Sequence, residues 1–168
     1  MSKLLYDGRW FSVHEVADGE MYVALDNAAM CVPLTPEGNV LFIVEPIAYG
    51  DAALTLYLPM GKMEPGENPA DTALRELQEE AGYYAGQMEH LGTLSPWVKY
   101  FTAQVSLYLA RDLTPHKLDG DERHTIAIEP IPLAAFEAEI VSGRLRDSTV
   151  IAALYLARAK LAAEQTHP

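Results

Sequence analysis

The chain has 168 residues, of which 49% are apolar and 21% are charged, so it can bury one hydrophobic core of ordinary domain size. This composition excludes a disordered tail and a small disulfide scaffold. The 24 acidic residues outnumber the 12 basic ones and leave a formal charge of −12. Proteins that bind the DNA or RNA backbone need a surplus of Lys and Arg, so the charge also argues against a nucleic-acid polymer as partner.

The cysteine content and the first residues bear on the cellular setting. One cysteine cannot form an intramolecular disulfide, and the opening stretch MSKLLYDGRW has no apolar run long enough for a signal peptide or a membrane span. We therefore expect a cytoplasmic protein without a membrane partner. The sequence contains no internal repeat and no dividing linker, so residues 1–168 are predicted to form a single domain.

The first third of the chain predicts strands. Asp18-Gly19 and Asp26-Asn27 supply turn chemistry between three β-compatible runs, which predicts an N-terminal antiparallel meander of residues 10–16, 21–26 and 28–34. The Pro-Glu-Gly-Asn sequence at 36–39 predicts a hairpin turn into a strand at 40–44. Residues 53–58 form a further candidate strand.

The rest of the chain mixes both kinds of element. Pro69 suits the first position of a helix and Gly82 suits its end, which predicts a helix between them. Further strands are expected at 88–94, 103–110 and 125–131, and further helices at 132–141 and 148–163. Because alternating βαβ units are missing, the order predicts a mixed α and β domain rather than a doubly wound parallel sheet.

Acidic residues are concentrated around the first predicted helix. Between positions 64 and 80 the only base is Arg75, and the six acids are Glu64, Glu67, Asp71, Glu76, Glu79 and Glu80. On an α-helix the last three occupy an arc of about 100° on one face. Like charges at this spacing destabilise an isolated helix unless a cation lies between them, and Mg²⁺ prefers oxygen ligands. The alternative is an ordinary solvated acidic face.

Arg75 and two glycines indicate how the loop before this helix is held. Arg75 follows Glu67 by eight residues and precedes Glu79 by four, so it could pair with a carboxylate and hold the preceding loop against the helix. A surface ion pair of little energetic value is the alternative. Gly61 and Gly66 bracket a loop and allow unusual backbone geometry or the close approach of another group.

The complete spacing is more specific than any of these residues alone. Gly61 is followed after five residues by Glu67, and after seven more by Arg-Glu-Leu-Gln-Glu-Glu-Ala-Gly-Tyr at 75–83. Residues 61–83 therefore resemble the Nudix box, the signature of the Nudix hydrolases. The resemblance implies an α+β fold, namely a Nudix-type α/β/α sandwich with a central mixed sheet, to which the N-terminal antiparallel meander within residues 1–38 is added.

The resemblance also implies roles for single residues. In this family the box binds a divalent metal and serves hydrolysis of a diphosphate linkage between a nucleoside diphosphate and another group. The implied ligands of Mg²⁺, which Mn²⁺ could replace, are three side chains and one backbone carbonyl, those of Glu76, Glu79, Glu80 and Met60. The implied supporting residues are Gly61, Glu67 and Arg75.

Similarity to one branch of the family extends beyond the box. The Tyr-Leu-Pro-Met-Gly sequence at 57–61 resembles the Leu-Pro-Ala-Gly entry of the ADP-ribose pyrophosphatases, and residues 142–147 with 149–158 resemble the C-terminal helix of that branch. The branch implies Mg²⁺-dependent hydrolysis of ADP-ribose, ADP-sugars or related ADP compounds, with release of a nucleoside monophosphate.

The base that activates water has three candidates. Residues 118–122 fall where the branch has an acidic loop with a catalytic glutamate, which implies Glu122. Glu76 and Glu79 compete for this role, because phosphoryl hydrolysis needs a carboxylate that orients water beside metal-bridged phosphate oxygens.

Two departures from the branch keep other functions open. Relatives carry an Arg where this chain has Glu45-Pro46-Ile47, and Val98 stands at the spacing of their marker proline, with Pro96 two residues early. A dinucleoside polyphosphate or nucleoside triphosphate hydrolase is therefore the alternative. A catalytically inactive nucleotide-binding regulator is less favoured, because no box glutamate is missing. An interaction module with a solvated acidic helix is the remaining hypothesis.

Aromatic and basic residues outside the box are candidates to contact substrate. The flat rings of Trp10, Phe11 and Tyr100 could stack on a base or sugar, although core packing is the commoner fate of such rings. Arg9 and Lys99 could contact phosphates, with surface solvation as the alternative.

The expected partners follow from the same resemblance. They are a small nucleoside diphosphate derivative and a second copy of the chain, because relatives in this branch are usually homodimers whose N-terminal strands help to complete the partner's site. Residues 1–38 are therefore expected to take part in dimer formation.

Overall fold

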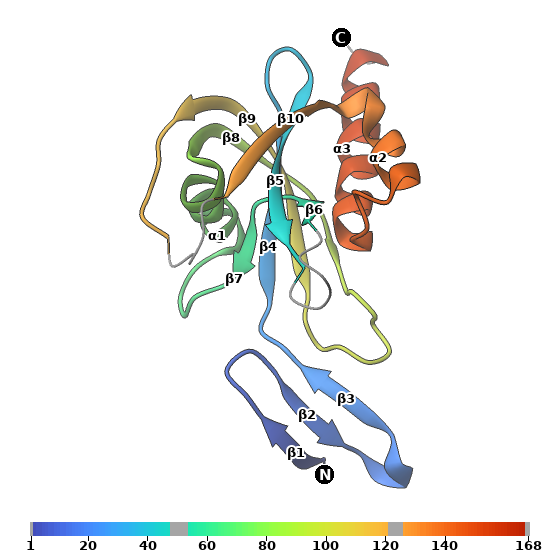
Figure 1. Ribbon diagram of the computed structural model, residues 1–168. Helices are drawn as coiled ribbons and strands as arrows, with labels where there is room; N and C mark the ends of the chain where they lie inside the picture. Colours follow the sequence, from blue (N-terminus) through green and yellow to red (C-terminus); the bar gives the residue numbers. More distant parts are fainter. Residues whose placement is uncertain (1, 48–53, 121–125, 167–168) are drawn as a thin grey trace.

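A four-stranded sheet between two helical layers forms the centre of the computed structural model, which describes residues 2–47, 54–120 and 126–166 (Figure 1). Its strands follow the order β7 (Met60–Lys62), β4 (Ala28–Pro33), β9 (Val105–Pro115) and β8 (Tyr83–Leu94). β4 and β9 are parallel, whereas the two outer pairs are antiparallel. The central mixed sheet that the sequence predicts is therefore present.

Side-chain alternation along β4 explains how helices pack on both faces of this sheet. The two covering helices are α1 (Pro69–Glu76) and α3 (Ser148–Thr166). Ala29 and Cys31 are buried in the cluster that contains α1, whereas Met30 and Val32 are buried in the cluster that contains α3. Successive strand residues point to opposite faces, so one strand contributes to both cores. The result is the predicted α/β/α sandwich (Figure 1).

A second sheet extends the larger core. It is antiparallel, with the order β10 (Ala127–Pro132), β5 (Asn39–Pro46) and β6 (Leu54–Tyr57). Phe42 and Leu56 from this sheet are buried with α3 residues and with Phe136, the first residue of α2 (Phe136–Ser142). The single-turn 3₁₀ helix Leu133–Ala135 leads into α2, within the helix predicted at 132–141.

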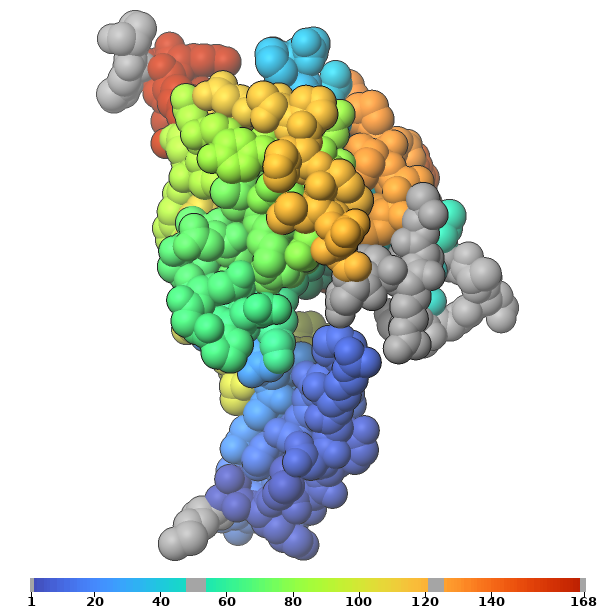
Figure 2. Space-filling view, turned by 90° about the vertical axis from the view of Figure 1, so that its left-hand side faces the viewer, coloured from blue at the N-terminus to red at the C-terminus, as the bar shows by residue number. Residues whose placement is uncertain are grey.

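The N-terminal strands form a separate sheet below the sandwich, coloured blue in Figures 1 and 2. It contains β1 (Lys3–Asp7), β2 (Ser12–Glu15) and β3 (Met21–Ala24) as an antiparallel meander, with a single-turn 3₁₀ helix, Ala17–Gly19, between β2 and β3. Hydrogen bonds join Val23 to the segment after β8, with Tyr100 O accepting from Val23 N at 2.8 Å and Val23 O accepting from Thr102 N at 3.1 Å. The predicted meander is confirmed, and the strands predicted at 10–16 and 21–26 correspond to β2 and β3.

The sequence placed one strand in the wrong sheet and did not predict another. The sequence placed residues 28–34 in the meander, but β4 lies in the central sheet and pairs with β9, so Asp26-Asn27 does not turn between antiparallel partners. A strand buried on both faces belongs in the middle of a sandwich, and β4 is buried over nearly its whole length. The meander instead begins with β1, whose residues are all exposed and therefore carry no burial pattern to predict it.

Other boundaries also differ from the sequence prediction. β7 was not predicted, and β8 begins at Tyr83, immediately after the helical segment, rather than at 88. The turn at 36–39 is present, because Thr35 N donates to Asn39 O at 2.8 Å and Gly38 adopts a φ of +83°. It joins strands of different sheets, however, and a Leu34–Val40 bridge links them at the turn. No helix among the described residues is long and apolar enough to cross a membrane.

Candidate active site

The helical segment of the box begins as predicted and ends in a wider turn. The Asn68 side chain accepts hydrogen bonds from Ala70 N and Asp71 N at 3.0 Å each, and Pro69 occupies the first helical position. The α-helical geometry stops at Glu76, and Leu77–Ala81 form a π-helical turn that Gly82 ends with a φ of +77°. The prediction of a regular α-helix is therefore wrong for its last turn, which carries Glu79 and Glu80. Single π turns of this kind often occur at functional sites.

Gly61 gives Glu76 its position. A Cβ atom at residue 61 would lie 1.7 Å from Glu76 Oε1 and 2.1 Å from Glu76 Cδ, far inside van der Waals contact. The Glu76 side chain is only 11% exposed and cannot move freely into solvent. Glycine is therefore required here because a carboxylate lies directly against the backbone of β7.

Arg75 joins the loop to three glutamates. Its Nε donates to Glu67 Oε1 at 2.9 Å, and its Nη1 donates to Glu76 Oε1 at 2.7 Å and to Glu79 Oε2 at 2.9 Å. Its Nη2 donates to Lys62 O at 3.2 Å. The guanidinium is only 23% exposed, and its hydrogen bond to Glu67 is the main reason that the Arg75 pKa is raised. The predicted pairing of Arg75 with the loop and the helix is confirmed.

Glu67 holds the loop before the helix. Its Oε2 accepts hydrogen bonds from Glu64 N and from the Thr72 hydroxyl, both at 2.9 Å. The hydrogen bond from Arg75 contributes most to lowering the Glu67 pKa to about 2, and the Glu64 N–H contributes next. Glu67 is therefore a permanent anion at neutral pH that anchors Arg75.

Glu80 faces the start of β7. Its Oε2 accepts a hydrogen bond from Met60 N at 3.0 Å, and its side chain is buried. Glu76 and Glu79 are directed toward Arg75 instead, and within the described ranges no three acidic, His or Cys side chains already converge as a metal site. In this conformation the guanidinium compensates the charge of the box carboxylates.

A cavity of about 580 Å³ opens beside these residues, and we call it the box cavity. Its lining includes Trp10, Met60, Gly61, Arg75, Glu76, Glu79, Glu80 and Asp119. The sequence therefore predicted most of the residues that the fold brings together here. Figure 2 shows that the blue N-terminal sheet reaches the green segment that contains the box, which agrees with the place of Trp10 in this lining.

The segment before residue 121 is tied to the end of the box helix. His116 N donates to Gly82 O at 2.8 Å, Leu118 N donates to Gln78 O at 3.2 Å, and Lys117 Nζ donates to the Glu79 carbonyl. These contacts bring Asp119 into the lining of the box cavity, a residue that sequence reasoning did not single out. Glu122, the predicted loop glutamate, lies outside the described residues.

The predicted substrate contacts divide into two groups. The Arg9 guanidinium lies 4.6 Å from the Trp10 ring centroid, and Arg9, Trp10 and Phe11 line a smaller hollow of about 240 Å³ on the N-terminal sheet. Lys99 lies above the Tyr100 ring, 5.4 Å from its centroid, and neither residue lines that hollow or the box cavity. The fold thus places Trp10 at the box and leaves Lys99 and Tyr100 outside its lining.

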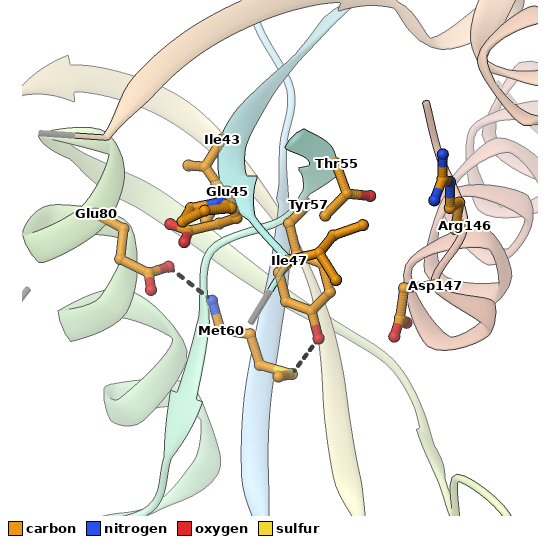
Figure 3. A pocket seen from close by; sticks show the side chains of 10 residues that line it. Ile43, Glu45, Ile47, Thr55, Tyr57, Met60, Glu80, Arg146 and Asp147 are labelled. Carbon is orange, nitrogen blue, oxygen red and sulfur yellow. Dashed lines mark hydrogen bonds between the residues drawn. The ribbon is translucent and has the colours of Figure 1, made fainter. Parts of the chain in front are cut away.

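A second cavity, of about 430 Å³, adjoins the box on the side of α3, and we call it the distal cavity (Figure 3). It shares Met60 and Glu80 with the box cavity. Residues that sequence reasoning gave no role line the rest of it, including Thr55, Tyr57, Arg146 and Asp147. Two sequence signals pointed to this region: Glu45-Pro46-Ile47, where relatives carry an arginine, and the Asp-Ser-Thr sequence before the last helix, which predicts a capping residue rather than a binding one.

Known proteins resemble this chain over most of its length. The family model of the NUDIX domain matches residues 24–149. The chain belongs to the Nudix family. An ADP compounds hydrolase of Escherichia coli (strain K12), NudE, is 30% identical over 131 residues, which cover 78% of this chain and 69% of that protein. The ADP-ribose pyrophosphatase of Bacillus subtilis (strain 168) is 31% identical over 99 residues, which cover 56% of this chain and 53% of that protein.

A solved structure agrees with this family assignment. The crystal structure of an ADP compounds hydrolase matches this Nudix protein with a TM-score of 0.83 and 27% sequence identity, over 98% of this chain and 93% of that chain. The predicted fold class and the predicted Nudix hydrolase are therefore confirmed.

Replacement of Gly61 by alanine tests the close approach of Glu76. We expect Gly61→Ala to lower kcat about 100-fold, because the new methyl group must displace the Glu76 carboxylate by more than 1 Å. Steady-state kinetics and a thermal melt measure the effect. Gly38→Ala is the matched control, since its φ of +83° makes alanine cost about 1 kcal/mol of stability without touching the box. A Gly61→Ala enzyme with unchanged kcat would contradict this account.

The Glu67–Arg75 pair predicts a pH-dependent contribution to stability. Because the Glu67 pKa is about 2 in the folded protein and ordinarily 4.5, its contribution is complete above pH 4.5 and is lost as the pH falls toward 2. We expect Glu67→Gln to lower the free energy of unfolding by about 1 to 2 kcal/mol at pH 7, after allowance for solvent screening. Urea denaturation should find a smaller difference from the wild type at pH 3. An equal difference at both pH values would refute the assignment.

Proposed function

We propose that this Nudix hydrolase splits the diphosphate linkage of a nucleoside diphosphate joined to another moiety, with ADP-ribose, ADP-sugars and related ADP compounds as substrates and a nucleoside monophosphate as one product. The observation that carries the proposal is that Glu76, Glu79 and Glu80 lie at one cavity, where Arg75, Gly61 and Met60 N hold them. The names of the Escherichia coli and Bacillus subtilis relatives support the substrate class.

The donor set at the box cavity fits a divalent metal. Nudix hydrolases generally use divalent cations, and the missing Cβ of Gly61 leaves room for a carboxylate against the backbone. We assign Mg²⁺, which Mn²⁺ could replace, to oxygen atoms of Glu76, Glu79, Glu80 and the Met60 carbonyl. When bound, the cation would neutralise charge on the diphosphate and so favour attack by water.

The protein's own side chains hold the box carboxylates in place and orient the attacking water. Arg75 holds Glu76 and Glu79 through one nitrogen, Nη1, so both carboxylates stay at the cavity although they repel each other. A carboxylate can accept a proton or a hydrogen bond through either of its oxygen atoms. Glu79, Glu76 and Glu122 are our candidates for the base that orients the attacking water, and a variant of each distinguishes them.

The nucleoside end of the substrate has a candidate site at the N-terminal sheet. Trp10 lines the box cavity and is 64% exposed, so its ring is available to stack on a base. Arg9, above the Trp10 ring, places a positive charge beside it. We keep Phe11 as a further candidate because it lines the same small hollow, whereas Lys99 and Tyr100 lack support from either cavity.

One observation favours the alternative substrates. Glu45 lies in the distal cavity where the branch carries an arginine, so this chain departs there from the pattern of the ADP-ribose enzymes. A dinucleoside polyphosphate or nucleoside triphosphate hydrolase is therefore our second candidate. A catalytically inactive nucleotide-binding regulator is disfavoured, because every box glutamate is present and positioned by Arg75 or Met60.

We also propose that the protein is a homodimer formed through its N-terminal strands. Besides the candidate substrate contacts, large apolar side chains on this small sheet are exposed, and they include Leu4, Leu5, Tyr6 and Met21. Several large exposed apolar side chains on one small sheet are typical of a protein that uses this sheet as an interface. A second copy would cover them.

A product-resolved assay tests the proposed reaction. Purified protein is incubated with Mg²⁺ and, separately, with ADP-ribose, NADH, diadenosine polyphosphates and nucleoside triphosphates, and the products are separated by chromatography. We expect ADP-ribose to yield AMP and ribose 5-phosphate fastest, and excess EDTA to abolish turnover until Mg²⁺ is restored. Full turnover in EDTA, or hydrolysis of nucleoside triphosphates alone, would overturn the proposal.

Variants in the same assay assign the base. Three variants each remove one candidate carboxylate: Glu79→Gln, Glu76→Gln and Glu122→Gln. Loss of the essential base should lower kcat at least about 100-fold. If Glu122→Gln kept near-wild-type turnover while Glu79→Gln abolished it, the loop glutamate would be excluded as the base. Glu37→Gln is the control for net charge, because Glu37 lies in an exposed turn outside both cavities.

A further inference from the structure

We propose that the distal cavity binds the second moiety of the substrate and selects an uncharged, hydroxyl-bearing group, such as a pentose or hexose, against an anionic one. This inference rests on the proposed diphosphate hydrolysis, because it assigns the group beyond the second phosphate. The discrimination is assigned to Asp147, which opposes anions, and to Arg146, which partly offsets it.

The position of the cavity suits a group linked through the diphosphate. Met60 and Glu80 belong to the linings of both cavities, so a molecule that places its diphosphate at the box can extend into either one. Trp10 lies at the box cavity and supplies the stacking surface for the nucleoside. The distal cavity, of about 430 Å³, is then the space that remains for the second moiety, and this volume is in the ordinary range for small-molecule sites.

The walls combine an apolar surface with polar groups around it. Ile43, Tyr57 and Met60 form the apolar part, and the Tyr57 hydroxyl donates to Met60 Sδ at 3.7 Å, which holds the ring in place. Figure 3 shows Glu80 on one side of these residues and Asp147 on the other. A sugar ring presents C–H groups to such an apolar wall and hydroxyl groups to carboxylates, which accept hydrogen bonds.

The charges of the described lining oppose an anion. Apart from Glu80, which we assign to the metal, they comprise two carboxylates, Glu45 and Asp147, against one guanidinium, Arg146. The carboxylates of Glu45 and Asp147 line one cavity, so their negative charges repel each other across it. A phosphate or carboxylate in this space would meet the same repulsion, whereas a neutral hydroxyl group would not.

Backbone N–H groups at the start of α3 hold the Asp147 carboxylate in place, and its negative charge still lines the distal cavity. Its Oδ1 accepts hydrogen bonds from Thr149 N at 2.8 Å and from Val150 N at 3.0 Å, which caps the start of α3. Asparagine caps a helix about as well as aspartate does. Asp147→Asn therefore removes the charge and keeps the cap, so that a change in specificity can be separated from a change in folding.

Arg146 is the only basic group in this lining, as far as the described residues extend. Its Nε donates to Gly143 O, and no ion pair with another described residue involves it. The guanidinium is exposed, so it can donate to a hydroxyl group while it weakens the negative potential of the cavity. Replacement of Arg146 should therefore change the substrate preference in the opposite direction to replacement of Asp147.

The experiment compares two substrates that differ in one charged group. These are ADP-ribose and ADP-ribose with a phosphate on the terminal ribose, and the measured quantity is the ratio of their kcat/KM values. We expect the wild type to prefer ADP-ribose, Asp147→Asn to reduce that preference about fivefold, and Arg146→Gln to increase it. Glu37→Gln, which makes the same change in net charge in a remote exposed turn, should leave the ratio unchanged.

The possible outcomes separate this inference from the proposed function. A wild type that prefers the phosphorylated substrate, or variants that shift the ratio in the same direction, would overturn the inference while the diphosphate hydrolysis stands. Thermal melts should find Asp147→Asn as stable as the wild type. If neither substrate is hydrolysed, the proposed function fails. The selectivity is then tested by calorimetry, which gives the dissociation constants of the two compounds. Equal affinities of the wild type for both would overturn the proposed selectivity.

Discussion

The site depends on one interaction, the enclosure of the Arg75 guanidinium by carboxylates of the loop and the helix. Glu67 binds Arg75 from the loop, and Glu76 and Glu79 bind it from the helix. Without this cation, three acids within a few ångströms would repel one another and the loop would lose its attachment to the helix. Because Arg75 and the glutamates are only partly exposed, solvent screens the attraction less than in a surface ion pair.

The sandwich places this charged cluster at the meeting point of two cavities. The α1 segment packs on one face of β4, and Gly61 in the neighbouring β7 brings the backbone against Glu76. The π-helical turn then carries Glu80 to Met60, at the border of the box cavity and the distal cavity. A single short strand thus connects the acidic helix with both cavities.

The Nudix box could be predicted because its residues lie close together in the sequence. The sheet order could not, because it depends on strands that are far apart in the sequence. The spacing of Gly61, Glu67 and Arg75 lies within one loop and helix, so the sequence predicts both the family and the Arg75 pairing. The place of β4 was predicted wrongly because its partner, β9, lies more than 70 residues later, and a turn-like Asp26-Asn27 suggested a nearer one. The π-helical turn has no residue signature, and the distal cavity joins residues of β5, β6 and the start of α3 that no motif connects.

The most direct test of the central claim measures metal binding without any substrate. Electron spin resonance of free Mn²⁺ during titration gives the affinity of the wild type, of Glu76→Gln and of the surface control Glu37→Gln. If the carboxylates around Arg75 and Gly61 form a divalent metal site, Glu76→Gln should weaken Mn²⁺ binding about tenfold or more, and Glu37→Gln should bind like the wild type. Equal Mn²⁺ affinity in the wild type and in Glu76→Gln would contradict the account.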